Sequence, residues 1–149
     1  MNLVNNTSMN ERILSISGKP GLFKLVSQGK NMLIVEELAT GKRRPAYMRD
    51  KVMSLADIAM YTTDEDVPLY TIYDSISKLE GGKAVDMAAL DSDDAVREYF
   101  AKVLPDFDRE RVYTSDIRKA LAWYNQLIAA GITEFVPAGK NEDTANEEA

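Results

Sequence analysis

The sequence predicts an α+β protein, in which a small SH3-like β barrel is followed by a bundle of about three α-helices. Short runs of branched and aromatic residues alternate with turn signals between residues 12 and 63, as expected of a small β unit. Between residues 66 and 131 the apolar residues recur at helical spacing instead. We therefore expect a flexible N-terminus at residues 1–11, a barrel at 12–63, a helical domain at 64–136 and a disordered acidic tail at 137–149.

Three turn signals divide the β part into short strands. Residues 19–22 are Lys-Pro-Gly-Leu, which suits a type II turn because proline fixes φ at the second position and glycine supplies positive φ at the third. Residues 28–31 and 39–42 each contain a glycine among mostly polar residues, and they predict two further turns.

The runs between these turns have the composition of strands. Residues 22–26 and 32–35 are rich in branched and aromatic side chains. The second run is apolar on both faces, so we expect it to be covered on both sides. A third strand at 43–48 contains Pro45, which cannot donate a ladder hydrogen bond and is therefore expected at a sheet edge or beside a bulge.

The β part is predicted to finish with one helical turn and a last strand. Ser54 can cap a turn at residues 54–57, and residues 58–62 then form the last strand. This order of elements resembles SH3-like small barrels in pattern, an architecture that serves many unrelated functions. Residues 12–16 fit either a first strand or a helical turn stopped by Gly18.

The second half predicts three amphipathic helices, between residues 66 and 81, 91 and 105, and 114 and 131. Pro105 ends the second helix, and Gly131 is suited to a left-handed cap after the third. Residues 133–136 then predict a short extended piece. The buried stripes are expected to be Leu69, Ile72, Tyr73, Ile76 and Leu79; Val96, Tyr99, Phe100, Val103 and Leu104; and Ile117, Ala120, Leu121, Tyr124 and Ile128.

The chain contains neither cysteine nor histidine. It therefore offers no disulfide framework, no thiolate nucleophile and no imidazole, which is the usual general base near neutral pH and the commonest zinc ligand. These absences argue against an enzyme, and we expect no cofactor. No apolar run approaches the length of a membrane span, and the N-terminus lacks the features of a secretory signal. We expect a cytoplasmic protein that does not enter membranes.

Charge is divided unevenly along the chain. Residues 1–53 hold nine Lys or Arg and four Asp or Glu, a net charge of +5, whereas residues 54–149 hold nine and twenty, a net charge of −11. The sequence therefore predicts a basic barrel joined to an acidic helical part.

Basic residues at the turns and strand ends of the barrel form the first candidate binding site. If they share a face with an exposed aromatic such as Phe23 or Tyr47, they could follow a phosphate backbone and stack bases. The alternative is a solvated rim that protects sheet edges or pairs with the acidic helices. The acidity of the whole chain argues against nucleic acid. The set comprises Lys19, Lys24, Lys30, Lys42, Arg43, Arg44, Arg49 and Lys51, with Tyr47.

Aromatic residues of the helical part form a second candidate, and the helical stripes assign most of them to the core. Trp123 and Leu127 flank the main stripe of their helix, so they are the residues expected to face a partner chain. The aromatic group is Tyr70, Tyr73, Tyr99, Phe100, Tyr113, Trp123 and Tyr124.

Two further motifs are incomplete. Residues 106–110 place acids at positions 1, 3 and 5 as a calcium loop does, but Arg111 and Ile117 occupy the positions that require Gly and Glu. We interpret this segment as a turn between helices. Residues 15–21 contain Gly, Ser and Lys without the spacing of a phosphate loop, and we interpret them as a turn into a strand.

Several strings together resemble a known family. They are ILSISGKPGLFKLVSQGK, TGKR, DIAMYT, REYFAKVLPDFDRERVY and SDIRKALAWYN, which span roughly residues 11 to 131. They are similar to a family of small bacterial proteins known as a domain of unknown function, with a companion helical C-terminal unit. The resemblance implies the two-part layout and carries no activity or site residue.

The leading functional hypothesis is a non-catalytic cytosolic binding or scaffold module that contacts another protein or a second copy of itself. It predicts an exposed apolar patch near Trp123. The alternative is a nucleic-acid or ribosome-associated protein, and it predicts that Lys42, Arg43 and Arg44 converge with Lys24.

Overall fold

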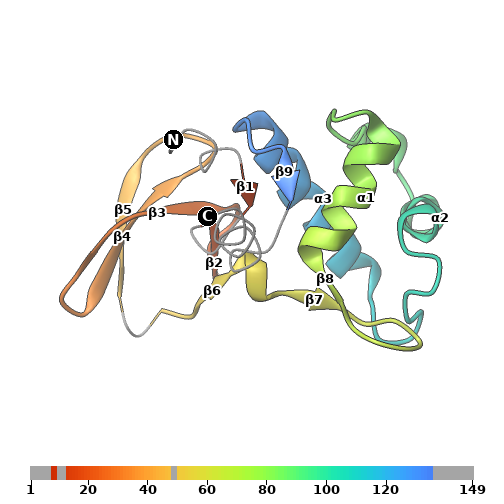
Figure 1. Cartoon of the computed structure of the whole chain (residues 1–149), viewed down its shortest axis with the longest axis horizontal. Coiled ribbons are helices and arrows are strands. Elements are labelled where there is room, and N and C mark those ends of the chain that lie inside the picture. Colours follow the sequence, from red (N-terminus) through yellow and green to blue (C-terminus); the bar gives the residue numbers. More distant parts are fainter. Residues whose placement is uncertain (1–7, 10–12, 48–49, 136–149) are drawn as a thin grey trace, which may run out of the picture.

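The structure is a computed structural model that describes residues 8–9, 13–47 and 50–135. A five-stranded antiparallel sheet lies beside three helices (Figure 1), which confirms the predicted α+β class. The strands of this sheet are β2 (Ile13–Ile16), β3 (Phe23–Gly29), β4 (Met32–Glu37), β5 (Arg43–Tyr47) and β6 (Val52–Ser54).

The sheet is curled but open. Its order is β5-β4-β3-β2-β6, so β5 is an edge strand, as Pro45 predicts. Only residues 48–51 separate the two edge strands in the sequence. The five peptide steps from residue 47 to residue 52 span at most roughly 18 Å. The end of β5 must therefore lie near the start of β6, and the sheet curls. Within the described residues no ladder joins β5 to β6, so the closed SH3-like barrel is not formed.

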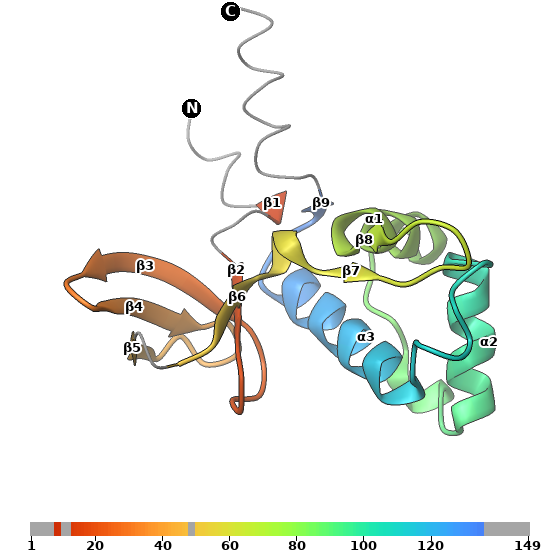
Figure 2. The same ribbon diagram turned by 90° about the horizontal axis from the view of Figure 1, so that it is seen from below.

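The two faces of the sheet differ in burial. Strand register places one set of apolar side chains on the inner face of the curl, where they form a small core of Leu14, Ile16, Phe23, Val35 and Ala46. In β4 only Val35 is buried, and Met32, Leu33 and Ile34 are partly exposed. The expectation that this strand is covered on both sides is therefore wrong, because the helices lie to one end of the sheet rather than over its outer face (Figure 2).

The strand predicted at residues 58–62 does not belong to the large sheet. After the 3₁₀ turn Leu55–Asp57, which Ser54 caps as predicted, β7 (Ala59–Met60) pairs with β8 (Val67–Pro68). Thr62 then forms a bridge with Phe107. Leu55 and Met60 are buried in the core of the helical part, and this burial draws the segment away from the curled sheet.

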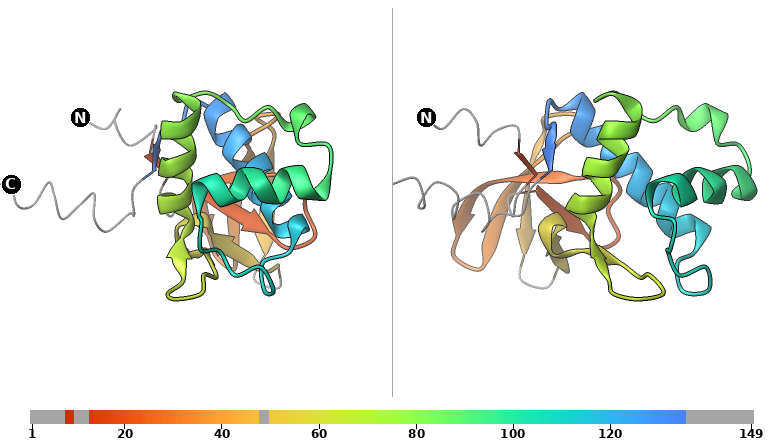
Figure 3. Two further views of the ribbon diagram at one scale, coloured as in Figure 1. Left: turned by 90° about the vertical axis from the view of Figure 1, so that its right-hand side faces the viewer. Right: turned by 45° about the vertical axis from the view of Figure 1, so that its right-hand side comes forward.

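The helices match the predicted apolar periodicity, except that Leu79, expected in the first buried stripe, is 50% exposed because it lies at the end of its helix, and Tyr99 and Ile128 are only partly buried. The helices are α1 (Leu69–Glu80), α2 (Asp93–Val103) and α3 (Thr114–Ala129), with a 3₁₀ turn at Met87–Ala89. The first begins later than expected, because Val67 and Pro68 pair with β7 and leave Pro68, not Asp66, at the N-cap. Figure 3 shows α1 and α2 in front of α3, with the sheet behind them.

The main core lies between the helices and extends to Phe135, near the end of the described chain. The rings of Tyr73, Tyr124 and Phe135 pack with centroids 5.6 to 5.8 Å apart. Phe135 belongs to β9 (Glu134–Phe135), the extended piece predicted at 133–136, which pairs in parallel with β1 (Ser8–Met9). The predicted flexible N-terminus thus contributes a strand at Ser8–Met9, while residues 1–7 and the predicted tail at 137–149 lie outside the described residues.

One side chain of α3 fastens the sheet to the helices. The Leu22 amide donates to Oε1 of Gln126 at 2.9 Å. Gly21 has φ +81°, and a Cβ there would meet the Gln126 amide at 3.3 Å. Leu22 is 1% exposed and shares the main core with the helices. The turn between β2 and β3 is therefore seated directly on α3.

Gln126→Ala is expected to lower the free energy of unfolding by about 1–3 kcal/mol, because it leaves the Leu22 amide without its acceptor. Urea denaturation followed by circular dichroism measures the change. The control is Gln28→Ala, an exposed position on β3 that should change stability by less than about 0.5 kcal/mol. Equal effects of the two substitutions would contradict the anchoring role of Gln126.

Candidate binding pocket

A pocket opens where β6 and β7 approach α3. Its volume is about 440 Å³, within the usual range for ligand sites. The lining residues are Met53, Ile58, Ala59, Met60, Tyr61, Asp66, Leu69, Arg111, Val112, Asp116, Lys119, Ala120 and Trp123. Trp123, which the sequence predicts at an interface, therefore stands in the wall of a hollow.

Exposed apolar side chains gather around this pocket. Met53 and Tyr61 line it and are 53% and 44% exposed. Tyr113 is 65% exposed and follows the lining residue Val112. Single exposed apolar residues are normal on a protein surface. Several of them around one concavity are typical of an interaction site.

Both aromatic walls of the pocket carry a cation. The Arg111 guanidinium lies 4.1 Å from the centre of the Tyr61 ring. The Lys119 ammonium lies 5.5 Å from the centre of the Trp123 ring. Such cation–π contacts hold a long side chain against a ring face, so the apolar walls end in a charged rim.

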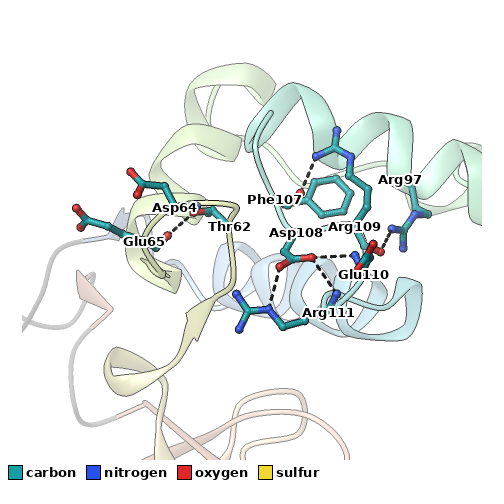
Figure 4. Close-up of polar contacts among 9 residues, drawn as sticks. All are labelled: Thr62, Asp64, Glu65, Arg97, Phe107, Asp108, Arg109, Glu110 and Arg111. Carbon is teal, nitrogen blue, oxygen red and sulfur yellow. Dashed lines mark hydrogen bonds and ion pairs between the residues drawn. The ribbon is translucent and has the colours of Figure 1, made fainter.

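Arg111 is fixed from its other side by Asp108 (Figure 4). Its Nε donates to Asp108 Oδ2 at 2.9 Å, while Oδ1 accepts the amides of Glu110 and Arg111 at 2.9 and 3.2 Å. The bond from Arg111 holds the pKa of the Asp108 carboxyl below its usual range, and the same bond raises the pKa of Arg111. The pocket therefore has an ordered, ion-paired corner.

The loop that carries Arg111 is held by two other arginines. Arg97 donates to the carbonyl oxygens of Arg109 and Val112 at 2.8 and 3.2 Å. Arg109 donates to those of Pro105 and Phe107 at 2.8 and 2.7 Å, with its guanidinium 4.0 Å from the centre of the Phe107 ring. These bonds assign residues 106–110 to a connection between helices. Among the described residues, no three acidic side chains gather as a metal site would require.

The two residues predicted at a partner interface have different environments. Trp123 is partly exposed in the pocket wall, whereas Leu127 is 0% exposed in the main core. Leu127 lies one turn further along α3, on the side that packs against the other helices. The interface prediction therefore depends on Trp123 alone.

The basic residues of the sheet share a face only in part, because Arg43 lies on the outer face and Arg44 on the opposite one. Arg43 and Arg44 are consecutive in β5, so their side chains point to opposite faces. Arg43 Nε pairs with Glu36 Oε1 at 3.3 Å, and Arg44 pairs with Glu37. The hydrogen bond from Thr40 and then the bond from Arg44 lower the pKa of Glu37.

Lys24 and Tyr47 of the predicted set lie together with Arg43, whereas Phe23, the other aromatic considered for this site, is buried. Lys24 shares the outer face with Arg43, because Glu36 is paired with both positions. Tyr47 is 39% exposed at the end of β5 on that same face. Lys19 and Lys42 are exposed in turns, and Arg49 lies outside the described residues.

Three tyrosines of the helical part, two buried and one partly buried, also have raised pKa values. Burial raises the pKa values of Tyr73, Tyr99 and Tyr124, and a bond from Tyr99 Oη to Glu80 Oε2 at 2.6 Å adds to the effect at Tyr99. None of these residues lines the pocket. The pocket itself combines apolar walls with charged side chains at its rim.

Comparison with known proteins identifies the two parts of the chain. Residues 11–55 match a domain of unknown function, DUF5606, and residues 58–127 match a second one, DUF6852. A solution NMR structure of a protein from Bacteroides vulgatus is 56% identical, covers 84% of this chain and 89% of that chain, and superposes with a TM-score of 0.68. The chain belongs to this two-domain family. No curated protein matches it.

The DUF5606–DUF6852 boundary passes through the pocket. Met53 comes from the first domain, and the other lining residues come from the second. Sequence patterns signal Trp123 but not the opposite wall of Met53, Tyr61 and Arg111. These residues are far apart in the chain, so that the folding of the second domain brings Tyr61 and Arg111 to Trp123, and the packing of the two domains adds Met53.

Asp108→Asn is expected to destabilise the protein at pH 7, because it removes the acceptor of the Arg111 bond. Since the pKa of Asp108 is lowered in the folded state, its contribution is complete above about pH 4–5, where an unperturbed Asp is ionised, and is lost as the pH falls through the lowered pKa. Thermal unfolding from pH 2 to 7 measures the difference from wild type. Asp106→Asn is the control, and an equal pH profile for both variants would contradict the assignment.

Labelled single-stranded and duplex RNA and DNA are expected to show no binding at physiological salt, because Arg43 and Arg44 are paired and point to opposite faces. Fluorescence anisotropy of the labelled nucleic acids at low and physiological salt measures the binding. Tight binding that weakens steeply with salt and is lost in Arg43→Glu/Arg44→Glu would overturn this expectation.

Proposed function

We propose that the protein is a non-catalytic binding module of the cytoplasm, whose pocket between β6, β7 and α3 accepts an apolar side chain of a partner protein. The observation that carries the proposal is the clustering of Met53, Tyr61 and Trp123 around one hollow of about 440 Å³. Burying apolar surface contributes about 25 cal/mol per Å². A partner side chain that fills this hollow thus gains affinity from apolar burial alone, without a covalent or catalytic step.

The residue types at the pocket support a protein partner. Trp, Tyr and Arg are the residues most enriched among those that dominate binding energy at interfaces. Trp123, Tyr61 and Arg111 meet in this pocket, and Arg111 and Lys119, although exposed, lie over the rings of Tyr61 and Trp123. The surface is therefore largely preorganised, which reduces the entropy lost on binding.

The two domains have complementary roles in this proposal. The curled sheet presents Met53 from its edge strand β6. The helical domain supplies the remaining walls. The partner is a different protein or a second copy of the chain, and the mass of the complex distinguishes the two.

Tyr61→p-benzoylphenylalanine is expected to form a discrete photo-cross-linked adduct in cells that produce the chain, because position 61 stands at the pocket mouth. Leu79→p-benzoylphenylalanine is the matched control, since Leu79 is 50% exposed on α1 and does not line the pocket. Gel mobility and mass spectrometry measure the adduct and identify its partner.

The adduct at position 61 should decrease strongly when Trp123→Ala is also present, because that substitution removes one wall of the pocket. Similar adducts at positions 61 and 79, or no adduct at either, would contradict the proposed function.

A further inference from the structure

Strand β7 meets the pocket with its edge. The four consecutive residues 58–61 all line the pocket. Side chains in a strand alternate between its two faces, so a strand seen face-on would contribute only every second residue. The backbone of β7 is therefore part of the pocket wall.

The register of β7 leaves one position of this edge open. Ala59 is paired with Pro68, and the Leu69 amide donates to the Ile58 carbonyl at 2.8 Å. In an antiparallel ladder this bond makes Ala59 and Pro68 a non-hydrogen-bonded pair, which suits Pro68 because proline has no N–H. The N–H and C=O of Ala59 thus point away from β8.

The neighbouring position on the same edge is already occupied. The Asp108 amide donates to the Tyr61 carbonyl at 3.0 Å, and the Thr63 amide donates to the Asp106 carbonyl at 2.9 Å. The loop at 106–108 therefore pairs with this edge from Tyr61 onward and stops before Ala59. Ala59 is exposed at the pocket.

The charges of the pocket rim are not equally compensated. Asp108 neutralises Arg111, and Asp66 contributes to the raised pKa of Arg111 from the same side. Asp116 accepts the Tyr113 amide at 3.0 Å. In the described part of the chain no carboxylate forms an ion pair with Lys119, which is exposed beside Trp123.

We propose that the occupant of the pocket is an extended peptide strand that pairs with the backbone of Ala59, places a bulky apolar side chain between Tyr61 and Trp123, and sets an acidic residue beside Lys119. This inference rests on the proposed function and adds the chemistry of the partner to it. Strand addition draws affinity from main-chain hydrogen bonds and specificity from side-chain pockets. A helical ligand could not use the free edge, because its backbone groups are bonded internally.

Peptides provide the test. A random twelve-residue library displayed on phage is selected against the full chain, and the enriched peptides are synthesised with a fluorescein label. Binding is measured by anisotropy and by the emission of Trp123, the single tryptophan of the chain. We expect the enriched peptides to share a bulky apolar residue next to Asp or Glu.

Ala59→Pro is the decisive variant. It removes the open N–H without breaking a bond between β7 and β8. Ile58 has φ −92° and ψ 139°, which suit a residue before proline, so the fold should be retained, as circular dichroism can verify. Binding of the peptides to Ala59→Pro should weaken about fivefold to tenfold, as for the loss of one hydrogen bond. The control substitution Leu79→Ala should leave peptide binding unchanged.

N-methylation of the peptide tests the same hydrogen bonds from the ligand side. Successive amides of a bound strand point alternately toward β7 and away from it. Methylation of the amides that point toward β7 should weaken binding, and methylation of the amides between them should not.

Lys119→Glu tests the charge. The Lys119→Glu variant should bind the acidic peptides more weakly than the wild type does. Peptides in which the acidic residue is exchanged for Lys should bind this variant with restored affinity. Peptides that change Trp123 emission but tolerate Ala59→Pro and every N-methylation would overturn strand addition while leaving the proposed binding function intact. A library that yields no peptide affecting Trp123 emission would overturn the peptide occupant, and the cross-link at position 61 would then decide the proposed function separately.

Discussion

The contact between Gln126 and the turn before β3 determines how the two domains meet. Gln126 satisfies the Leu22 amide and lies against Gly21, where any larger residue would strain a left-handed φ and approach the glutamine amide. Trp123 is three residues earlier on α3 and therefore lies on a neighbouring part of the same face. The same helix therefore holds the sheet through Gln126 and contributes Trp123 to the pocket, to which the sheet contributes Met53.

Sequence patterns predict those elements whose signals are local. Helical periodicity finds α1, α2 and α3, and Pro45 marks β5 as an edge strand. The partner of residues 58–62 has no local signal, because a short apolar strand fits either sheet equally well, and burial of Met60 among the helices decides the outcome. The pocket is missed for the same reason, since its walls come from separate segments. Leu127 and Trp123 flank one stripe in the sequence, and only packing shows which of them is covered.

In the described part of the chain, the adjacent arginines Arg43 and Arg44 do not present their charges on a common face. Arg43 and Arg44 pair across the hairpin with Glu36 and Glu37, and their side chains are 65% and 51% exposed. Such surface pairs contribute at most about 1 kcal/mol each. Opposite charges across two strands nevertheless favour one register over its neighbours. We therefore infer that these pairs help to align β4 with β5. Because side chains alternate between the two faces of a strand, the two arginines lie on opposite faces although they are adjacent in the sequence.

The rigidity of the pocket follows from where the arginines are used. Arg97 and Arg109 bond carbonyl oxygens of the loop that joins α2 to α3, and Asp108 fixes Arg111 against Tyr61. Ordering a loop on binding costs free energy for every residue that loses its conformational freedom. Here folding has already ordered that loop, and it pairs with the strand edge only as far as Tyr61. The same bonds therefore keep the pocket open and leave Ala59 as the position where another strand can continue the ladder.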